Sequence, residues 1–177
     1  MELILLQGNS KGNQEWMKEV ENELKDLFDS TYIQYYRHCD TGDRLIDLDY
    51  ELDILSNYLK KRKNYIILGK SAGVVLALKS ISEGKISPLK CMFLGTPVLW
   101  CNKENIPIEK WIKNYKIPTF FIQKTEDRVI FAKDLKKILY DSNVNNYKFI
   151  EIPGTDHHYG NFKEIKMLMK KLIKWKK

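Results

Sequence analysis

Short apolar runs alternate with amphipathic stretches along almost the whole chain, and this alternation restricts the fold more than any other feature. Between the apolar runs, hydrophobic residues recur three or four positions apart, which predicts helices. Strands that alternate with helices form right-handed βαβ units. The sequence therefore predicts an α/β fold of three layers, α/β/α, with a doubly wound and mostly parallel sheet of about six strands. Six runs have the apolar, β-branched or aromatic composition of strands: Leu3–Leu6, Tyr32–Tyr36, Tyr65–Leu68, Lys90–Leu94, Thr119–Gln123 and Tyr147–Ile152.

One segment interrupts this pattern. The chain has 177 residues, the size of one domain, and we expect residues 1–177 to form a single one. Between residues 95 and 118, however, Pro97, Trp100 and Pro107 break any long apolar period. The pattern predicts no regular element for this segment.

Membrane-spanning and secreted proteins are disfavoured by the sequence. No apolar run approaches the roughly 18 residues of a membrane span, and the first residues lack the basic flank and cleavage site of a signal peptide. Three cysteines, Cys39, Cys91 and Cys101, have no spacing typical of a metal site and suit reduced thiols. We therefore expect a cytoplasmic protein.

The positive charge is a weak indication of a partner. Thirty Lys and Arg residues against 23 Asp and Glu give a net charge of +7, but most are lysines spread over predicted helix surfaces. The sequence has no zinc-finger spacing, no aromatic RNA-binding strand and no arginine cluster, so we expect no nucleic-acid partner. Only Lys166–Lys177 carries basic residues without acidic ones. Binding of an anionic partner by this tail is one hypothesis for the function, and it is weaker than the two that are given below.

The turn after the third strand carries an unusual motif. Ligands bind beyond the carboxyl ends of parallel strands, and there Gly69-Lys70-Ser71-Ala72-Gly73 has the spacing Gly-x-Ser-x-Gly between a strand and a helix. In such a turn the serine takes a strained conformation that lifts its hydroxyl clear of the sheet. A phosphate-binding loop would need glycine at position 64, which is Asn64. A structural turn with an N-capping serine is the alternative.

An acidic residue follows the fifth strand. Asp127, in Lys124-Thr125-Glu126-Asp127-Arg128, is placed where a carboxylate can hold an imidazole in one tautomer. Glu126 is the rival, but its side chain is expected to point elsewhere. The alternative for Asp127 is an N-cap of the next helix.

The turn after the sixth strand holds two of the three histidines, His157 and His158. A histidine at a carboxyl-end turn, together with a serine and an acid at two other such turns, suggests catalysis. Weak cation binding by Asp156 and the two histidines is the alternative. His38 is treated as an ordinary exposed loop residue.

The order Ser71, Asp127, His157, each after a parallel strand, resembles the α/β-hydrolase superfamily, whose chain order is nucleophile, acid, histidine. The resemblance spans nearly the whole chain, and the family's Gly-x-x-His-x-aromatic pattern matches Gly154 to Tyr159 and selects His157. The first strand ends in Gln7-Gly8-Asn9-Ser10, which is similar to the family's oxyanion-hole loop.

The resemblance implies a serine hydrolase with a minimal α/β-hydrolase fold that lacks the family's first two strands. Ser71 would be the nucleophile, His157 the general base, Asp127 its orienting acid, and the backbone N–H groups of Asn9 and Ala72 the oxyanion hole. A small-molecule ester or thioester would be hydrolysed through an acyl-enzyme, with no cofactor and no metal. The oligomeric state is open.

Two departures from the family concern the site. Lys70 stands where the family usually has histidine, which adds positive charge beside the serine. No long lid insertion is present, so residues 95–118 are the candidate cover, with Trp100 and Trp111 as pocket walls. The main alternative is a catalytically silent binding protein that keeps this fold.

Overall fold

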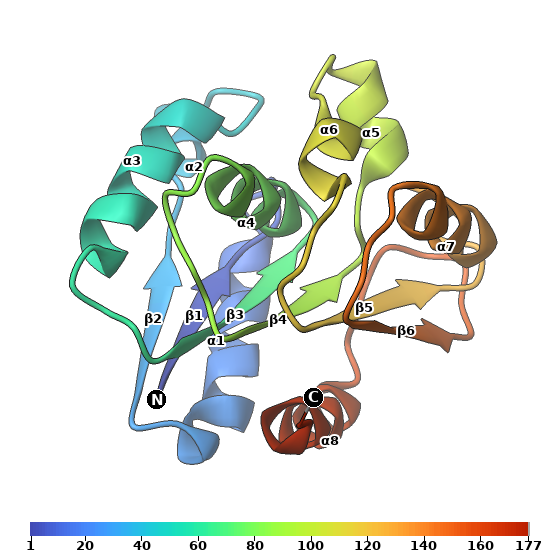
Figure 1. Cartoon of the computed structure of the whole chain (residues 1–177). Coiled ribbons are helices and arrows are strands. Elements are labelled where there is room, and N and C mark those ends of the chain that lie inside the picture. Colours follow the sequence, from blue (N-terminus) through green and yellow to red (C-terminus); the bar gives the residue numbers. More distant parts are fainter. Residues whose placement is uncertain (177) are drawn as a thin grey trace.

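The strands form one sheet in which every neighbouring pair is parallel. The computed structural model describes residues 1–176 (Figure 1), and Lys177, the end of the predicted domain and of the basic tail, lies outside the described residues. The strand order is β2-β1-β3-β4-β5-β6, so the order reverses beside β1. The strands within the described residues are β1 (Glu2–Leu6), β2 (Ser30–Gln34), β3 (Tyr65–Lys70), β4 (Lys90–Leu94), β5 (Thr119–Lys124) and β6 (Tyr147–Ile152).

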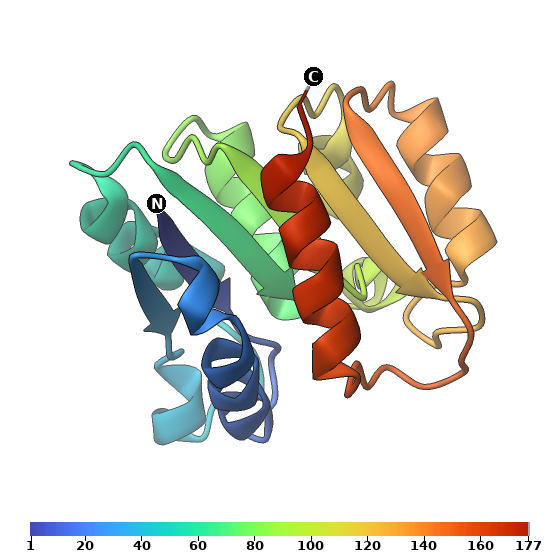
Figure 2. The ribbon, with the colours of Figure 1, turned by 90° about the horizontal axis from the view of Figure 1, so that it is seen from below.

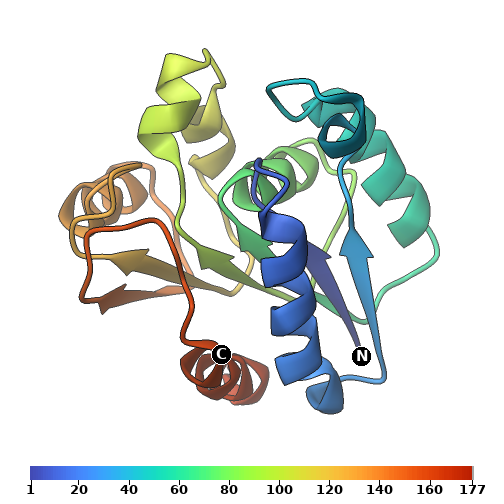
Figure 3. The ribbon, with the colours of Figure 1, turned by 180° about the vertical axis from the view of Figure 1, so that it is seen from behind.

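Helices cover both faces of this sheet, as the α/β/α prediction requires. Figures 2 and 3 show α1 and α8 side by side on one face, and Figure 1 shows α3, α4 and α7 on the other. The helices of the described chain are α1 (Asn13–Leu24), the 3-10 turn η1 (Lys25–Leu27), α2 (His38–Thr41), α3 (Leu48–Leu59), α4 (Ala72–Ser82), α5 (Val98–Lys103), α6 (Ile108–Ile112), α7 (Ala132–Asp141) and α8 (Phe162–Lys174).

The side chains of β1 point alternately to the two faces of the sheet, and each face has its own hydrophobic core. Leu3 and Leu5 pack into the cluster under α1 and α8, whereas Ile4 and Leu6 pack into the cluster under α3 and α4. All four side chains are fully buried. A strand covered on both faces must be apolar throughout, which explains the unbroken run in the sequence.

Two of the differences between the structure and the sequence prediction have a clear physical reason. The second strand ends at Gln34 rather than Tyr36, because β1 pairs with it only up to Leu6, whose partner is Gln34. The unpredicted segment 95–118 contains two short helices, α5 and α6, and α6 packs against α4. Its regular structure depends on that tertiary packing and not on a long apolar period.

Most of the basic tail, residues 166–174, belongs to α8, whose buried residues are Ile165, Leu168, Met169 and Leu172. Lys90 donates hydrogen bonds of 2.8, 2.8 and 2.7 Å to the carbonyl oxygens of Leu172, Ile173 and Trp175. Its positive charge therefore stabilises the C-terminal end of α8. Among residues 1–176, no helix is both long and apolar enough to cross a bilayer.

Candidate active site

The backbone of Ser71 is strained as the motif predicts. Ser71 has φ 51° and ψ −113° at the junction of β3 and α4, a conformation that residues with a side chain rarely adopt. Its N–H donates to Leu94 O over 3.0 Å, and its own carbonyl accepts from Val74 N over 2.9 Å, so the turn is fixed from both sides. Ser71 occupies the N-cap position, but its hydroxyl makes no capping hydrogen bond, so the N-capping alternative is wrong.

Gly73 allows α4 to start this close to the sheet. A Cβ built on Gly73 would lie 2.0 Å from the carbonyl oxygen of Leu6 on the neighbouring strand β1. No side chain fits at that distance. The second glycine of the motif is thus required by a backbone contact, independently of any chemistry at Ser71.

Asp127 and His157 are brought together by β5 and β6, which pair as far as Lys124 and Ile152. Nδ1 of His157 lies 2.8 Å from Oδ2 and 3.0 Å from Oδ1 of Asp127. The Asp127 side chain is fully buried, and Oδ1 also accepts from Val129 N over 3.1 Å. A carboxylate is only an acceptor, so Nδ1 must carry the hydrogen, and Nε2 of the neutral ring is then an acceptor.

Neither rival residue belongs to the hydrogen-bonded pair, although His158 lines the same cleft as Ser71 and His157. Glu126 and His158 are exposed, and Asp127 is not the N-cap of α7, a position that Phe131 holds. No group of three or more His, Cys, Asp or Glu side chains within residues 1–176 is arranged to hold a metal ion.

Two close contacts fix the His157 loop. Trp16 of α1 donates from Nε1 to the Tyr159 carbonyl over 2.9 Å. Beneath the ring, Gly95 has φ +62°, and a Cβ there would lie 2.5 Å from Cε1 of His157. The backbone after β4 therefore approaches the imidazole more closely than any other residue type would allow.

A cleft at the carboxyl edge of the sheet contains both Ser71 and His157. Asn9 and Trp100 also line it, whereas Trp111 is buried in the core beside α4, so the prediction of Trp111 as a pocket wall is wrong. Nε2 of His157 is buried and has no hydrogen-bond partner within residues 1–176. Ser71 and His157 thus line the same cleft, although no hydrogen bond joins the Ser71 hydroxyl to Nε2.

Asn9 is held in this cleft by three hydrogen bonds. Its side chain donates to Arg44 O and accepts from Ile46 N, both over 2.9 Å. Its carbonyl lies 2.6 Å from Nε2 of His38. Ala72 is the first residue of α4, so its N–H has no carbonyl partner in the helix.

His38 is not the exposed loop residue that the sequence analysis assumed. It is the first residue of α2, only 5% exposed, and its ring supports the Asn9 loop. The signal was its position: it follows the carboxyl end of β2, the neighbour of the strand that leads into Asn9. Position alone did not reveal the burial, to which contacts with the Asn9 carbonyl and the Tyr36 ring contribute.

Tyr159, which the sequence analysis named only as the aromatic residue of the family pattern, contacts Asp127 directly. Its hydroxyl donates to Asp127 Oδ2 over 2.9 Å and accepts from Lys124 N over 3.2 Å. Burial, followed by the nearby Asp127 charge, raises the pKa of Tyr159 well above its ordinary range. The phenol is therefore neutral and acts as a donor to the carboxylate.

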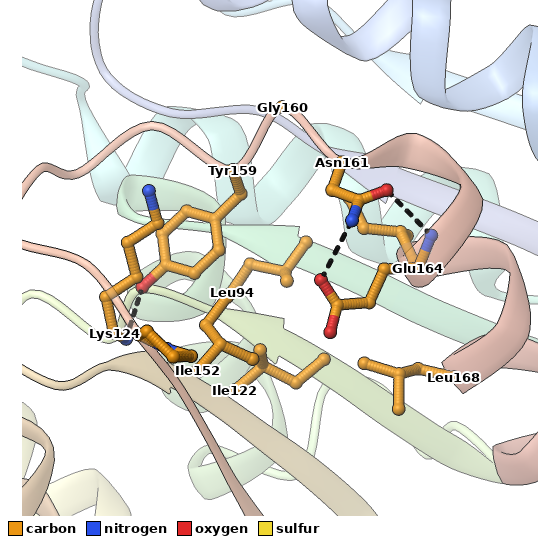
Figure 4. Close-up of a pocket in the computed structure, with 11 residues that line it drawn as sticks. Leu94, Ile122, Lys124, Ile152, Tyr159, Gly160, Asn161, Glu164 and Leu168 are labelled. Carbon is orange, nitrogen blue, oxygen red and sulfur yellow. Dashed lines mark hydrogen bonds between the residues drawn. The ribbon is translucent and has the colours of Figure 1, made fainter.

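A second pocket, of about 260 Å³, is lined on one side by Tyr159 (Figure 4). Its walls include Leu94, Ile122 and Leu168, and at one end the Asn161 amide donates to Glu164. Neither Ser71 nor His157 lines it. Tyr159 lines this pocket and also donates to Asp127, so it connects the pocket wall to the His157–Asp127 pair.

Solved structures similar to this chain share its fold. An uncharacterised protein from Bacillus cereus superposes with a TM-score of 0.75 at 19% identity over 98% of this chain and 59% of its own. A serine hydrolase homologue from Coxiella burnetii gives 0.74 at 15% identity, covering 97% and 84%. An esterase from Pyrococcus furiosus gives 0.69 at 17%, covering 98% and 81%.

These comparisons bear on the fold predicted from the sequence. This chain spans about three fifths of the length of the Bacillus protein, and most of the other two. No family model matches the sequence, and no curated protein matches it significantly. The resemblance to the α/β hydrolases is confirmed for the fold: the chain has a compact α/β-hydrolase-like architecture.

Proposed function

We propose that this protein is a serine hydrolase that cleaves a carboxylic ester or thioester of a small molecule through an acyl-enzyme. The observation that carries the proposal is the hydrogen bond between His157 and the buried Asp127, because it leaves Nε2 of His157 with no hydrogen-bond partner among residues 1–176, and His157 lines the same cleft as Ser71. Ser71, His157 and Asp127 have the roles of nucleophile, general base and orienting acid. The esterase and serine hydrolase homologue with the same fold support this class of reaction.

The mechanism proceeds in two halves. Ser71 Oγ attacks the carbonyl carbon while Nε2 of His157 takes its proton, and Asp127 stabilises the imidazolium that forms. The oxygen of the tetrahedral intermediate accepts from the N–H groups of Asn9 and Ala72, and the start of α4 adds a favourable dipole. The imidazolium then protonates the leaving alcohol or thiol. A water molecule, deprotonated by His157, releases the acid and restores Ser71.

One further feature concerns access to the cleft, and another concerns the compartment. The cleft is open, and α5, which carries Trp100, is the part of segment 95–118 that reaches it. Cys39, Cys91 and Cys101 are free thiols, which favours the cytoplasm.

Labelling with a fluorophosphonate, followed by intact mass, tests the proposal. We expect one adduct per chain in the wild type, and none in Ser71→Ala or His157→Ala. His158→Ala is the matched control, because His158 lines the same cleft but is exposed and makes no hydrogen bond with Asp127. A folded wild type that takes no label would contradict the hydrolase and favour a silent binding protein of this fold.

A further inference from the structure

Lys70 places a buried cation beside the proposed nucleophile. It is the last residue of β3, immediately before Ser71, and only 6% of it is exposed. Its Nζ lies 2.5 Å from Oδ1 of Asn13 and 5.0 Å from the ring centroid of Trp16. Both of these residues line the cleft, as Lys70 does.

This cation has no acidic partner. Within residues 1–176 no carboxylate lies within 4.0 Å of Nζ, and no Asp or Glu lines the cleft. Lysines are rarely buried this deeply without a counter-ion. An ammonium group carries three donors, and the hydrogen bond to Asn13 uses one of them.

The residue that holds Lys70 is itself fixed in orientation. The Asn13 amide donates to Ser10 O and Oγ over 3.0 and 2.7 Å, which directs its oxygen toward Lys70. Gly8 also packs closely against this amide, because a Cβ there would lie 2.7 Å from Nδ2 and 3.0 Å from Oδ1 of Asn13. The ammonium is thus held in a defined position, with donors to spare.

Burial without a counter-ion lowers the pKa of Lys70 to about 8, although the Asp127 charge acts in the opposite direction. At pH 7 the group is still mostly protonated. The cleft therefore contains a preorganised positive charge at neutral pH, with two histidines and no acidic side chain along the rest of its lining.

We propose that Lys70 determines substrate specificity by binding a carboxylate group of the substrate. This inference rests on the proposed hydrolase function and defines its substrate class: esters or thioesters that carry a free carboxylate a few bonds from the cleaved group. A carboxylate would provide the missing counter-ion and accept the unused donors of Nζ. The carboxylate can belong to the acyl part or to the alcohol part.

Matched pairs of esters test this class. Monomethyl glutarate is compared with methyl valerate for the acyl part, and 3-acetoxypropionate with propyl acetate for the alcohol part. A charge-assisted hydrogen bond predicts a kcat/KM about 10- to 100-fold higher for the charged member of one pair. In Lys70→Met this ratio should fall to near one, and using the ratio cancels any general loss of activity.

Lys136→Met is the matched control. It removes the same charge from the exposed side of α7 and should keep the wild-type ratio. A ratio near one for both pairs in the wild type would overturn the proposal, and so would a preference that survives Lys70→Met. Circular dichroism of each variant establishes that it is folded.

A binding measurement separates this inference from the hydrolase function. Glutarate is titrated calorimetrically into Ser71→Ala and into Ser71→Ala/Lys70→Met, neither of which needs to turn over an ester. If the wild type hydrolyses none of the esters, at least tenfold weaker binding with Lys70→Met would support the carboxylate site and refute only the hydrolase. Equal binding, or none, in that case would refute the carboxylate site as well.

Discussion

Tyr159 donates its hydroxyl to Oδ2 of Asp127 over 2.9 Å, and this is the same oxygen that lies 2.8 Å from Nδ1 of His157. The carboxylate is thus held by a phenol, an imidazole and the Val129 N–H without contact with water. Because Tyr159 fixes the orientation of the acid, it is a positioning residue in the proposed mechanism.

Tyr159→Phe should lower kcat moderately and leave KM nearly unchanged. A lost neutral hydrogen bond is worth about 0.5–1.5 kcal/mol, which corresponds to a roughly 2- to 10-fold decrease in rate. Steady-state kinetics on a short-chain ester measures this, with Tyr140→Phe, 81% exposed on α7, as the control. An unchanged kcat would show that the carboxylate needs no third donor.

Asp127→Asn should have a far larger effect than Glu126→Gln. The amide can offer its N–H to Nδ1, which favours the wrong imidazole tautomer, and the same change in a Ser-His-Asp triad lowers kcat by about 10⁴. Glu126 is exposed and should change kcat less than twofold. Comparable losses in both variants would show that the acid was assigned incorrectly.

The proximity of Asp127 and His157 could be predicted from the sequence, because it depends on local rules. Each residue follows a strand, consecutive parallel strands are usually neighbours, and their carboxyl ends meet at one edge of the sheet. The conformation of Ser71 was predictable for a similar reason, since a strand, a tight turn and a helix are all encoded within a few residues.

The positions of His38, Trp111 and Lys70 depend instead on contacts between distant segments. His38 is buried although α2 is a single short turn with no apolar period. Trp111 belongs to α6, which is buried against α4, a helix about 30 positions earlier in the sequence. Lys70 meets Asn13, 57 positions away in the sequence. The spacing of apolar residues along the sequence does not reveal such contacts between distant segments.

Gly73→Ala should destabilise the protein severely, because the added methyl would lie 2.0 Å from Leu6 O, a backbone atom that cannot move away as a flexible side chain could. Overpacking of this kind costs about 3 kcal/mol or more. Gly12→Ala is the control, since nothing lies within 4 Å of a Cβ built there. Urea unfolding should place Gly12→Ala within about 0.5 kcal/mol of the wild type. A stable Gly73→Ala would contradict the close approach of α4 to β1.

The three thiols should differ in reactivity in the native protein. Burial raises the pKa of both Cys91 and Cys101 to about 12, so almost no thiolate forms at pH 8. Burial also raises the pKa of Cys39, but that side chain is partly exposed. An aromatic disulfide reagent should therefore modify Cys39 slowly and the other two only after denaturation. Rapid modification of all three in the native state would contradict this burial.

Lys70→Met should stabilise the protein at neutral pH and lose this advantage as the pH rises. The pKa of Lys70 is about 8 in the folded chain against an ordinary value of 10.5, a gap that corresponds to about 3 kcal/mol. Below pH 8 both states of the wild type bind the proton, and the folded state bears the full cost of the buried charge. Between pH 8 and 10.5 only the unfolded state binds it, so the free energy of unfolding rises with pH.

Urea unfolding of the wild type and Lys70→Met at pH 7 and pH 10 measures this dependence. The stability difference between the two proteins should shrink by roughly 2–3 kcal/mol across that interval, whereas Lys136→Met should stay parallel to the wild type because Lys136 is exposed. A difference that is constant with pH would mean that the Lys70 ammonium is better solvated than its contacts indicate. The same result would weaken the carboxylate site, because a hydrated ammonium has no need of a counter-ion from the substrate.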